Sequence, residues 1–358
     1  RNGLRPLRYT ITSDDLFFAG SESGMIKIPE EKIISKGKLG PGQIIAIDLK
    51  KGKLFKDKEI KDYLAKDYKK YNKQIIDLEK KVSSEDEKAN FKGEELKKRQ
   101  YLSGLSMEDL ELILHPMAEE GKEASGSMGD DTPVAVLSSH FRPVSHYFRQ
   151  NFSQVTNPPI DSLRESKVMS LKTRFGNLGN ILDFDNLTEE DIYVLDSPIL
   201  TNSQLKKFKK IFSKKIKIID CIFDIKLSLK DRIDAIKEEC ETAVREGSTT
   251  LILSDKNTSK DKASIPTILA VGAVHSHLVK SGLRGYCSLN VESADALDTH
   301  SFAVLIGVGA TTVNPYLAID SINQRFEKKL FGKLDSQDCV KKFKKSIDAG
   351  LLKIMSKM

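Results

Sequence analysis

Features that would identify a catalytic or metal site are scarce in this sequence. Cysteine occurs only four times, at distant positions and with no CxxC pair: Cys221, Cys240, Cys287 and Cys339. This spacing argues against a disulfide framework, a structural zinc site and a cysteine-ligated iron–sulfur cluster. No stretch reaches the ~18 consecutive apolar residues that span a bilayer, and no hydrophobic leader is evident. We therefore predict a cytoplasmic, reducing location without membrane contact.

A strong excess of one charge is also absent. The 358 residues include 58 Lys and Arg against 51 Asp and Glu, a formal net charge of +7. Much of the surplus lies in lysine runs such as "KKYNK", "KKFKK" and "FEKK", which are typical of solvated helices. These runs lack the regular aromatic interleaving of a platform that stacks bases. The composition therefore predicts no nucleic-acid partner.

Known catalytic motifs are missing as well. The sequence has no GxSxG nucleophile elbow, no P-loop, no HExxH motif and no cysteine adjacent to a histidine. His275 and His277 lie two positions apart in a predicted helix, where they point to opposite sides and cannot hold one ion. His300 allows two interpretations, a pairing with Asp298 or Glu292 or a hydrogen-bonded structural role, and we favour the structural role. By themselves the residues indicate no catalytic, cofactor-binding or metal site.

The pattern of apolar residues divides the chain into regions. Residues 1–56 alternate short β-prone runs with turns and predict β-hairpins, and residues 57–114 are charged and amphipathic, typical of a helical linker. Residues 115–322 alternate apolar strands with helices, which predicts an α/β domain with a mainly parallel sheet flanked by helices. Residues 323–358 predict a helical connector.

Within these regions several segments have a definite predicted conformation. The apolar spacing predicts helix throughout residues 57–82 and one long helix over 229–247. The run "TPVAVLS" at 132–138 predicts a strand, and "VSHYFRQNF" at 144–152 predicts a helix.

Two polar loops stand out between the predicted elements. In "GSMGDDTP", at 126–133, Asp130 and Asp131 offer paired carboxylates for acid–base chemistry, or they cap and close a turn. In "SQVTNPPID", at 153–161, the double proline forces Asn157 into extended backbone and stiffens the loop. A rigid polar loop of this kind suits the lining of a passage or an interface.

The glycine-rich string "GVGATTVNP" allows two interpretations. Glycines after an apolar strand let a phosphate approach a helix, so the turn from Gly307 to Thr311 is a candidate for a phosphorylated ligand. The third glycine and the later acidic residue of the dinucleotide fingerprint are missing, which favours a tight structural turn.

Several strings, taken in order, resemble one family. They are "RNGLRPLRY", "LHPMAEEGKEASGSMGDDTPVAVLS", "QVTNPPIDSLRE", "AVGAVHSHLVKSGLR", "HSFAVLIGVGATTVNPYLA" and "GLLKIMSKM". Together they are similar to landmarks of the large chain of NADPH- or ferredoxin-dependent glutamate synthase. That family carries a class II glutamine amidotransferase domain, a central domain, an FMN-binding barrel with an iron–sulfur cluster, and a β-helix.

The resemblance implies a piece of a larger enzyme. Residues 1–56 would be the last hairpins of the amidotransferase domain, and the central domain would follow the linker. In the family the amidotransferase nucleophile is a cysteine at the mature N-terminus, a place taken here by Arg1, so we expect no glutaminase activity from this chain alone. FMN and the iron–sulfur cluster belong to the intact enzyme and not to these residues.

The resemblance also implies partners and a passage for ammonia. The partners would be the amidotransferase and FMN-binding domains, and either a small NAD(P)H-oxidising subunit or ferredoxin; a plastid location would apply in a photosynthetic eukaryote. Free ammonia would be protonated and lost to water, so the family needs an enclosed route between its two sites. We expect Met128, Thr156 and Asn157 to line it. The alternatives are an independent α/β enzyme that binds a phosphorylated ligand at the turn from Gly307 to Thr311, and a purely structural spacer between domains.

Overall fold

The computed structural model contains two compact units, Arg1–Asn72 and Lys73–Met358. It describes residues 7–40, 42–66, 75–82, 89–124, 135–139, 142–149, 160–161, 164–180, 182 and 191–357. Each unit is considered by itself, because their relative placement is not determined.

The first unit consists of antiparallel strands and one helix. Strand β1 lies between β2 and β3, and β4 pairs with β5. Tyr9 of β1 stacks on Phe17 of β2 with ring centroids 5.7 Å apart, and a side chain at Gly37 of β3 would collide with the Tyr9 ring. The elements are β1 (Leu7–Thr12), β2 (Phe17–Gly20), η1 (Glu30–Lys32), β3 (Ile33–Leu39), β4 (Ala46–Asp48), β5 (Lys53–Phe55) and α1 (Asp57–Ala65).

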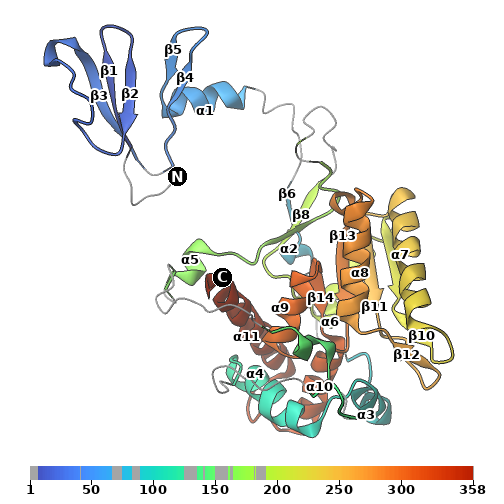
Figure 1. The fold of residues 1–358 in the computed structure, drawn as a ribbon. Helices are drawn as coiled ribbons and strands as arrows, with labels where there is room; N and C mark the ends of the chain where they lie inside the picture. The colour runs from blue at the N-terminus through green and yellow to red at the C-terminus, as the bar shows by residue number, and fades with distance from the viewer. Residues whose placement is uncertain are drawn as a thin grey trace. The chain divides into compact units, whose positions relative to one another are not determined.

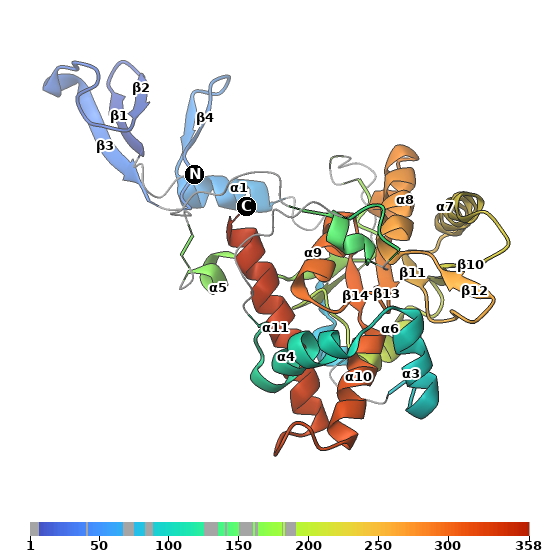
Figure 2. The ribbon, with the colours of Figure 1, turned by 60° about the horizontal axis from the view of Figure 1, so that its bottom comes forward.

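The second unit is built on a four-stranded sheet. Its strands are β9 (Ile216–Asp220), β11 (Thr250–Ser254), β13 (Ser288–Glu292) and β14 (Thr312–Asn314), in the order β14-β13-β11-β9 and all parallel. The crossover helices α7 (Leu229–Arg245), α8 (Thr267–Lys280) and α9 (Thr299–Gly307) lie side by side along one face (Figures 1 and 2). The predicted α/β class with a mainly parallel sheet is confirmed.

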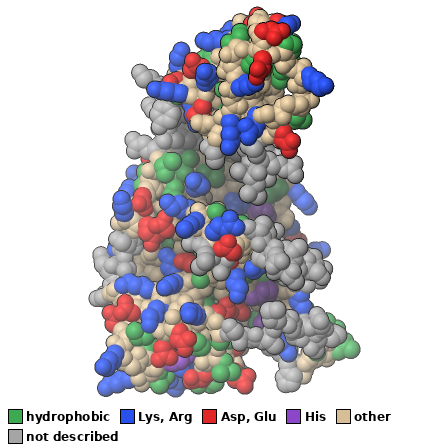
Figure 3. All heavy atoms as spheres, turned by 90° about the vertical axis from the view of Figure 1, so that its left-hand side faces the viewer, with side chains coloured by type: hydrophobic (Ala, Val, Ile, Leu, Met, Phe, Trp, Pro, Cys, Tyr) green, Lys and Arg blue, Asp and Glu red, His purple; other side chains and the backbone are tan. Residues whose placement is uncertain are grey.

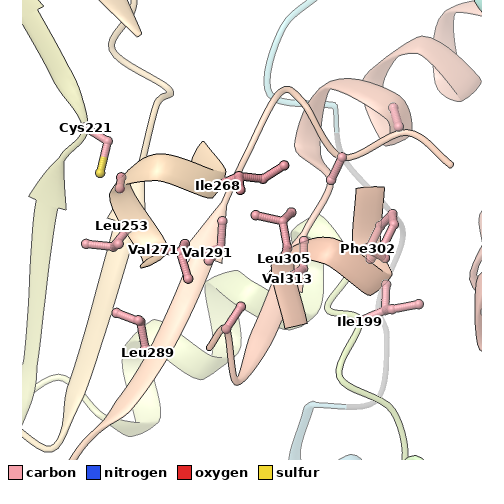
Figure 4. Close-up of a cluster of buried hydrophobic side chains, with 14 of the residues drawn as sticks. Ile199, Cys221, Leu253, Ile268, Val271, Leu289, Val291, Phe302, Leu305 and Val313 are labelled. Atoms are coloured by element: carbon pink, nitrogen blue, oxygen red, sulfur yellow. The ribbon is translucent and has the colours of Figure 1, made fainter. Parts of the chain in front are cut away.

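The main core lies between this sheet and the crossover helices. Alternate side chains of the strands, such as Leu253, Val291 and Val313, are fully buried against Val271 of α8 and Leu305 of α9 (Figure 4). Fully burying a side chain of this size contributes roughly 1.5–3 kcal/mol. The alternating apolar side chains therefore determine which face of the sheet packs on the helices.

The opposite face packs on helix α6 (Asn202–Ile211). Ile252 of β11 belongs to a second cluster with Leu205, Phe208 and Phe212 from α6 and the residue after it. The helix begins at Thr201 with a reciprocal cap, since the Thr201 hydroxyl accepts from the Gln204 amide and the Gln204 side chain accepts from the Thr201 amide. The cap and the aromatic residues therefore set the position of α6 over the sheet.

Smaller elements surround this layered centre. Strand β8 (Ile192–Leu195) pairs parallel with β6 (Ile75–Asp77) and antiparallel with β7 (Thr173–Phe175), and β10 (Ile222–Asp224) pairs antiparallel with β12 (Lys262–Ser264). The remaining elements are α2 (Glu79–Val82), α3 (Gly93–Leu102), the π-helical η3 (Asp109–Leu114), α4 (His115–Glu120), η4 (Val144–Tyr147), α5 (Glu165–Val168), η5 (Arg284–Tyr286), α10 (Tyr316–Glu327) and α11 (Ser336–Lys357). None of the helices among these described residues is long and apolar enough to cross a membrane.

Three segment predictions are wrong in the described residues. Residues 75–77 form a strand and not a helix, because β6 pairs with the distant β8. The described part of the predicted strand at 132–138 contains a turn closed by the Ser138 amide bonding the Ala135 carbonyl. In the described part of the helix predicted at 144–152, which ends at residue 149, the chain forms one 3₁₀ turn, and this turn buries Ser145. The long helix predicted at 229–247 is confirmed as α7.

Candidate functional site

The residues expected to line an ammonia passage cannot be placed. Met128, Thr156 and Asn157 lie outside the described residues, as do Asp130 and Asp131. Their role therefore stays a prediction.

The turn from Gly307 to Thr311 is a packed structural element. It joins the end of α9 to the start of β14, whereas the next helix begins only after that strand. The Arg284 guanidinium donates to the Gly309 carbonyl at 2.9 Å and to the Thr311 hydroxyl at 3.2 Å. Gly309 has a φ of 122°, and a Cβ there would lie 2.4 Å from the His275 ring. Protein groups thus fill the turn, and the element that follows it is a strand and not a helix, which favours the structural interpretation over phosphate binding.

The histidines have separate structural partners. His277 Nε2 lies 2.6 Å from a Glu241 oxygen, whereas His275 Nδ1 accepts from Arg284 at 3.2 Å. They do not share a site, as predicted. His300 Nε2 donates to the Ser145 carbonyl at 2.9 Å. The favoured structural interpretation of His300 is confirmed, with the Ser145 carbonyl as its partner.

A continuous polar face on the parallel sheet was missed by the sequence analysis. The side chains of Asn290 and Glu292 on β13, and of Thr312 and Asn314 on β14, alternate with the apolar ones that enter the main core, yet every one is buried. Thr312 donates to Asn290 Oδ1 at 2.7 Å, and Asn290 donates to the Leu251 carbonyl at 3.1 Å. A buried polar face of this kind is rare in a parallel sheet, and it lies on the α6 side.

Glu292 is the charged centre of this face, at the carboxyl end of β13. Its carboxylate accepts from Lys209 of α6 at 3.0 Å, from Lys256 at 3.3 Å and from the Ser254 hydroxyl at 2.9 Å. Burial by itself raises its pKa, but the charges of both lysines and the hydrogen bonds from Lys209 and Ser254 outweigh burial and hold the pKa below its ordinary value. Glu292 is therefore ionised at neutral pH and holds both ammonium groups in place.

Asp320 of α10 connects two segments at the carboxyl edge of the parallel sheet. Its carboxylate accepts from the backbone amides of Asn90 and Phe91 and from the Asn202 side chain, each at 2.9 Å. Asn90 in turn accepts from Lys256 Nζ at 2.6 Å. Burial raises the pKa of Asp320 to about 6, against the lowering effect of these donors. The segment at 90–91 and the start of α6 are thereby fixed together.

A cleft of about 710 Å³ opens between these groups. It lies at the carboxyl edge of the parallel sheet, which is where open α/β sheets commonly bind ligands. Five of the described residues that line it are lysines and one is a carboxylate. The full lining is Ala89, Asn90, Asn202, Ser203, Leu205, Lys206, Lys207, Lys209, Lys210, Lys256, Glu292 and Asn314. The signal in the sequence was the alternation in "SLNVE" and "TVN" together with the lysines of "QLKKFKK".

Two further carboxylates are buried beside this edge. Asp255 follows β11 and accepts from the Ala294 amide at 2.8 Å, and Asp295 accepts from the Thr267 amide at 3.3 Å. Burial and then the negative charge of Asp295 raise the pKa of Asp255 to about 7. The pair therefore favours holding a proton where separate carboxylates would be ionised.

The described residues do not fit an iron–sulfur cluster or another metal. They contain no group of three or more His, Cys, Asp or Glu that could hold an ion. The four cysteines are all buried, and Cys221, Cys240, Cys287 and Cys339 belong to the main apolar core. Burial raises the pKa of each thiol, to about 12 for Cys221 and about 11 for Cys287.

Charge on the outer surface is mixed. On the face shown in Figure 3, the Lys and Arg side chains of the described residues are interspersed with Asp and Glu. This face therefore carries no broad field of one sign.

Comparison with known proteins decides the family. The model of the glutamate synthase central domain matches residues 98–358, and that of class II glutamine amidotransferases matches residues 1–73. The chain belongs to the glutamate synthase family. The end of the amidotransferase match falls at the division between the two compact units at residues 72 and 73.

Glutamate synthases with different electron donors are similar to the whole chain. The NADPH glutamate synthase large chain of Azospirillum brasilense is 53% identical over 370 residues, which cover 100% of this chain and 24% of that protein. The chloroplastic ferredoxin-dependent glutamate synthase 2 of Arabidopsis thaliana is 39% identical over 375 residues, covering 100% of this chain and 23% of the relative. The NADPH large chain of Bacillus subtilis is 39% identical over 367 residues, again covering 100% and 23%. The chain thus spans about a quarter of the length of the relatives it matches.

Proposed function

We propose that this chain is the middle part of a glutamate synthase large chain and that its central domain both separates two catalytic domains and lines the ammonia passage between them. In this proposal residues 1–56 are the last hairpins of the amidotransferase domain, and residues 57–114 are a helical linker. Residues 115–322 form the central domain, and residues 323–358 connect it to the FMN-binding domain. The order of the two family matches along one chain supports the arrangement.

The observation that carries the passage is the convergence of two segments on one helix end. Glu123, just before the segment that contains Met128, lies against Thr299 in the first turn of α9. Ser145, just before the segment that contains Thr156 and Asn157, accepts from His300 in the same turn. The described residues Glu123 and Ser145, which precede the two candidate segments, therefore meet at one place in the fold, which supports a common passage.

Helix α11 forms hydrogen bonds with residues on both sides of the two candidate segments. Lys342 Nζ donates to the Glu119 carbonyl at 2.6 Å, and the Ser356 hydroxyl donates to Glu165 at 2.8 Å. Glu119 precedes the first candidate segment, and Glu165 follows the second. One long helix therefore holds described residues on both sides of the candidate segments.

The chemistry expected of the passage is to carry neutral ammonia without stabilising ammonium. A hydroxyl at Thr156 and an amide at Asn157 can exchange hydrogen bonds with ammonia, whereas a carboxylate would favour the protonated form. Met128 would supply a flexible apolar constriction. Glutamine hydrolysis, 2-oxoglutarate as acceptor, FMN and the iron–sulfur cluster belong to the complete enzyme in this proposal, with a small NAD(P)H-oxidising subunit or ferredoxin as electron donor.

The test is made in the complete enzyme that carries this chain. Thr156→Val and Asn157→Ala should let glutamine hydrolysis outrun the consumption of 2-oxoglutarate, because ammonia escapes before reduction. Thr242→Val, an exposed threonine on α7, is the matched control and should leave the two rates equal. Equal rates in both passage variants would leave the central domain a structural spacer.

A further inference from the structure

The cleft at the carboxyl edge of the sheet has no role in the proposed passage of ammonia. It is formed by β13, β14, α6 and the segment at 89–90, and none of its described lining residues belongs to the proposed passage. Its volume of about 710 Å³ falls within the range of roughly 300–1,000 Å³ that small-molecule sites occupy. It is therefore a separate candidate for binding.

The net charge of the side chains that line the cleft determines which ligand charge it attracts. Lys209 and Lys256 already neutralise Glu292 and are held by it. Lys206 and Lys210 also line the cleft, are exposed on α6, and form no ion pair with any other described residue. The cleft thus carries positive charge in excess of its one carboxylate, which favours an anionic ligand.

Asn314 adds a second requirement, for a hydrogen-bond donor in the ligand. It is 1% exposed, and its side-chain NH₂ donates to the Leu200 carbonyl at 2.8 Å and to Asn202 Oδ1 at 3.1 Å. Its Oδ1 atom is buried and accepts no hydrogen bond from any described residue. A buried acceptor without a donor is unfavourable, and a ligand with an N–H group would satisfy it.

We propose that this cleft binds a nucleoside diphosphate, with the phosphates towards Lys206 and Lys210 and an N–H of the base towards Asn314 Oδ1. The ligand has both groups that the lining requires, an anion and a hydrogen-bond donor, at opposite ends of one molecule. Parallel α/β sheets bind nucleotides at this edge. The proposal is independent of the ammonia passage, since it uses none of the same residues.

Titration calorimetry of the chain with ADP at low ionic strength tests the proposal, because low salt preserves the attraction between charges. Lys206→Glu with Lys210→Glu should weaken ADP binding by about tenfold or more, through repulsion of the phosphates. Lys345→Glu with Lys353→Glu, a reversal of two exposed lysines on α11, is the matched control and should leave the affinity unchanged. Circular dichroism verifies that each variant is folded.

Ligand variants test the role of Asn314 without altering the protein. The ADP analogue with a dimethylated 6-amino group and inorganic pyrophosphate should each bind more weakly than ADP, because they lack the base N–H. The proposal is overturned by an absence of ADP binding, or by an equal loss in both lysine pairs. Binding of pyrophosphate or of the dimethylated analogue as tightly as ADP would overturn the contact with Asn314.

Discussion

The Asn202 side chain donates a hydrogen bond of 2.9 Å to the carboxylate of Asp320, which lies 118 residues later in the chain. The same carboxylate accepts from the amides of Asn90 and Phe91. One buried side chain thereby joins the start of α6, helix α10 and the segment before α3. The shape of the cleft depends on this junction.

Replacement of Asp320 should loosen the junction. Asp320→Asn retains one acceptor oxygen but turns an NH₂ group towards existing donors, so we expect a loss of about 1–3 kcal/mol in the free energy of unfolding. Urea denaturation of the second unit measures it. Asp261→Asn, at an exposed position, is the control. An Asp320→Asn variant as stable as the control would show that these hydrogen bonds contribute little.

The buried pair of Asp255 and Asp295 should make stability depend on pH. The pKa of Asp255 is raised from 3.8 to about 7, so between these values the folded state binds more protons than the unfolded state. Its contribution is complete below the unfolded value and is lost as pH rises through the folded value. Relative to Asp255→Asn, the unmodified chain should lose about 2–4 kcal/mol between about pH 4 and about pH 8.

Denaturation curves of both proteins across this pH range provide the comparison. Because other carboxylates titrate in both proteins, the difference between the two curves reports the buried pair of Asp255 and Asp295. Stability curves that stay parallel from acid to neutral pH would contradict a raised pKa at this site.

The turn after α9 offers a test with two neighbouring glycines. Gly309→Ala should destabilise the fold, because φ is 122° and the new Cβ would lie 2.4 Å from the His275 ring. A cost of about 2 kcal/mol or more follows from strain together with the clash. Gly307→Ala is the control, since nothing lies within 4 Å of its Cβ position and it ends a helix. Thermal unfolding should separate the two variants, and equal melting temperatures would contradict the packing described for Gly309.

The cysteines should be unreactive in the native chain. All four are buried, and burial raises the pKa of each thiol, so little thiolate exists at neutral pH. A thiol-specific reagent such as 5,5′-dithiobis(2-nitrobenzoic acid) should react only as fast as the chain unfolds, and fully in denaturant. Rapid labelling of any cysteine in the folded chain would contradict its burial.

The layered α/β architecture could be predicted because its signals are local. Each long helix, such as α7, repeats apolar residues at helical spacing, and each strand of the parallel sheet precedes one. Strand β6 could not be predicted in this way, because its conformation depends on pairing with β8 far along the chain. The partner of His300 was missed for the same reason, since Ser145 lies 155 residues earlier.

The polar face was missed because the strands were interpreted as continuous apolar runs. In β13 the residues Asn290 and Glu292 occupy every second position, which marks a face that differs from the core. Their meaning depends on Lys209 of α6 and Asp320 of α10, whose proximity no local pattern indicates. The turn from Gly307 to Thr311 is the opposite case. Its glycine pattern suggested a ligand site, but in the fold Arg284 occupies the turn.

We propose that this domain keeps ammonia enclosed between two catalytic sites of the complete enzyme. The most direct measurement compares glutamine hydrolysed with 2-oxoglutarate consumed in the complete enzyme carrying Thr156→Val, against the Thr242→Val control. The account predicts that hydrolysis exceeds consumption in the first enzyme and equals it in the second. Equal rates in both would contradict it.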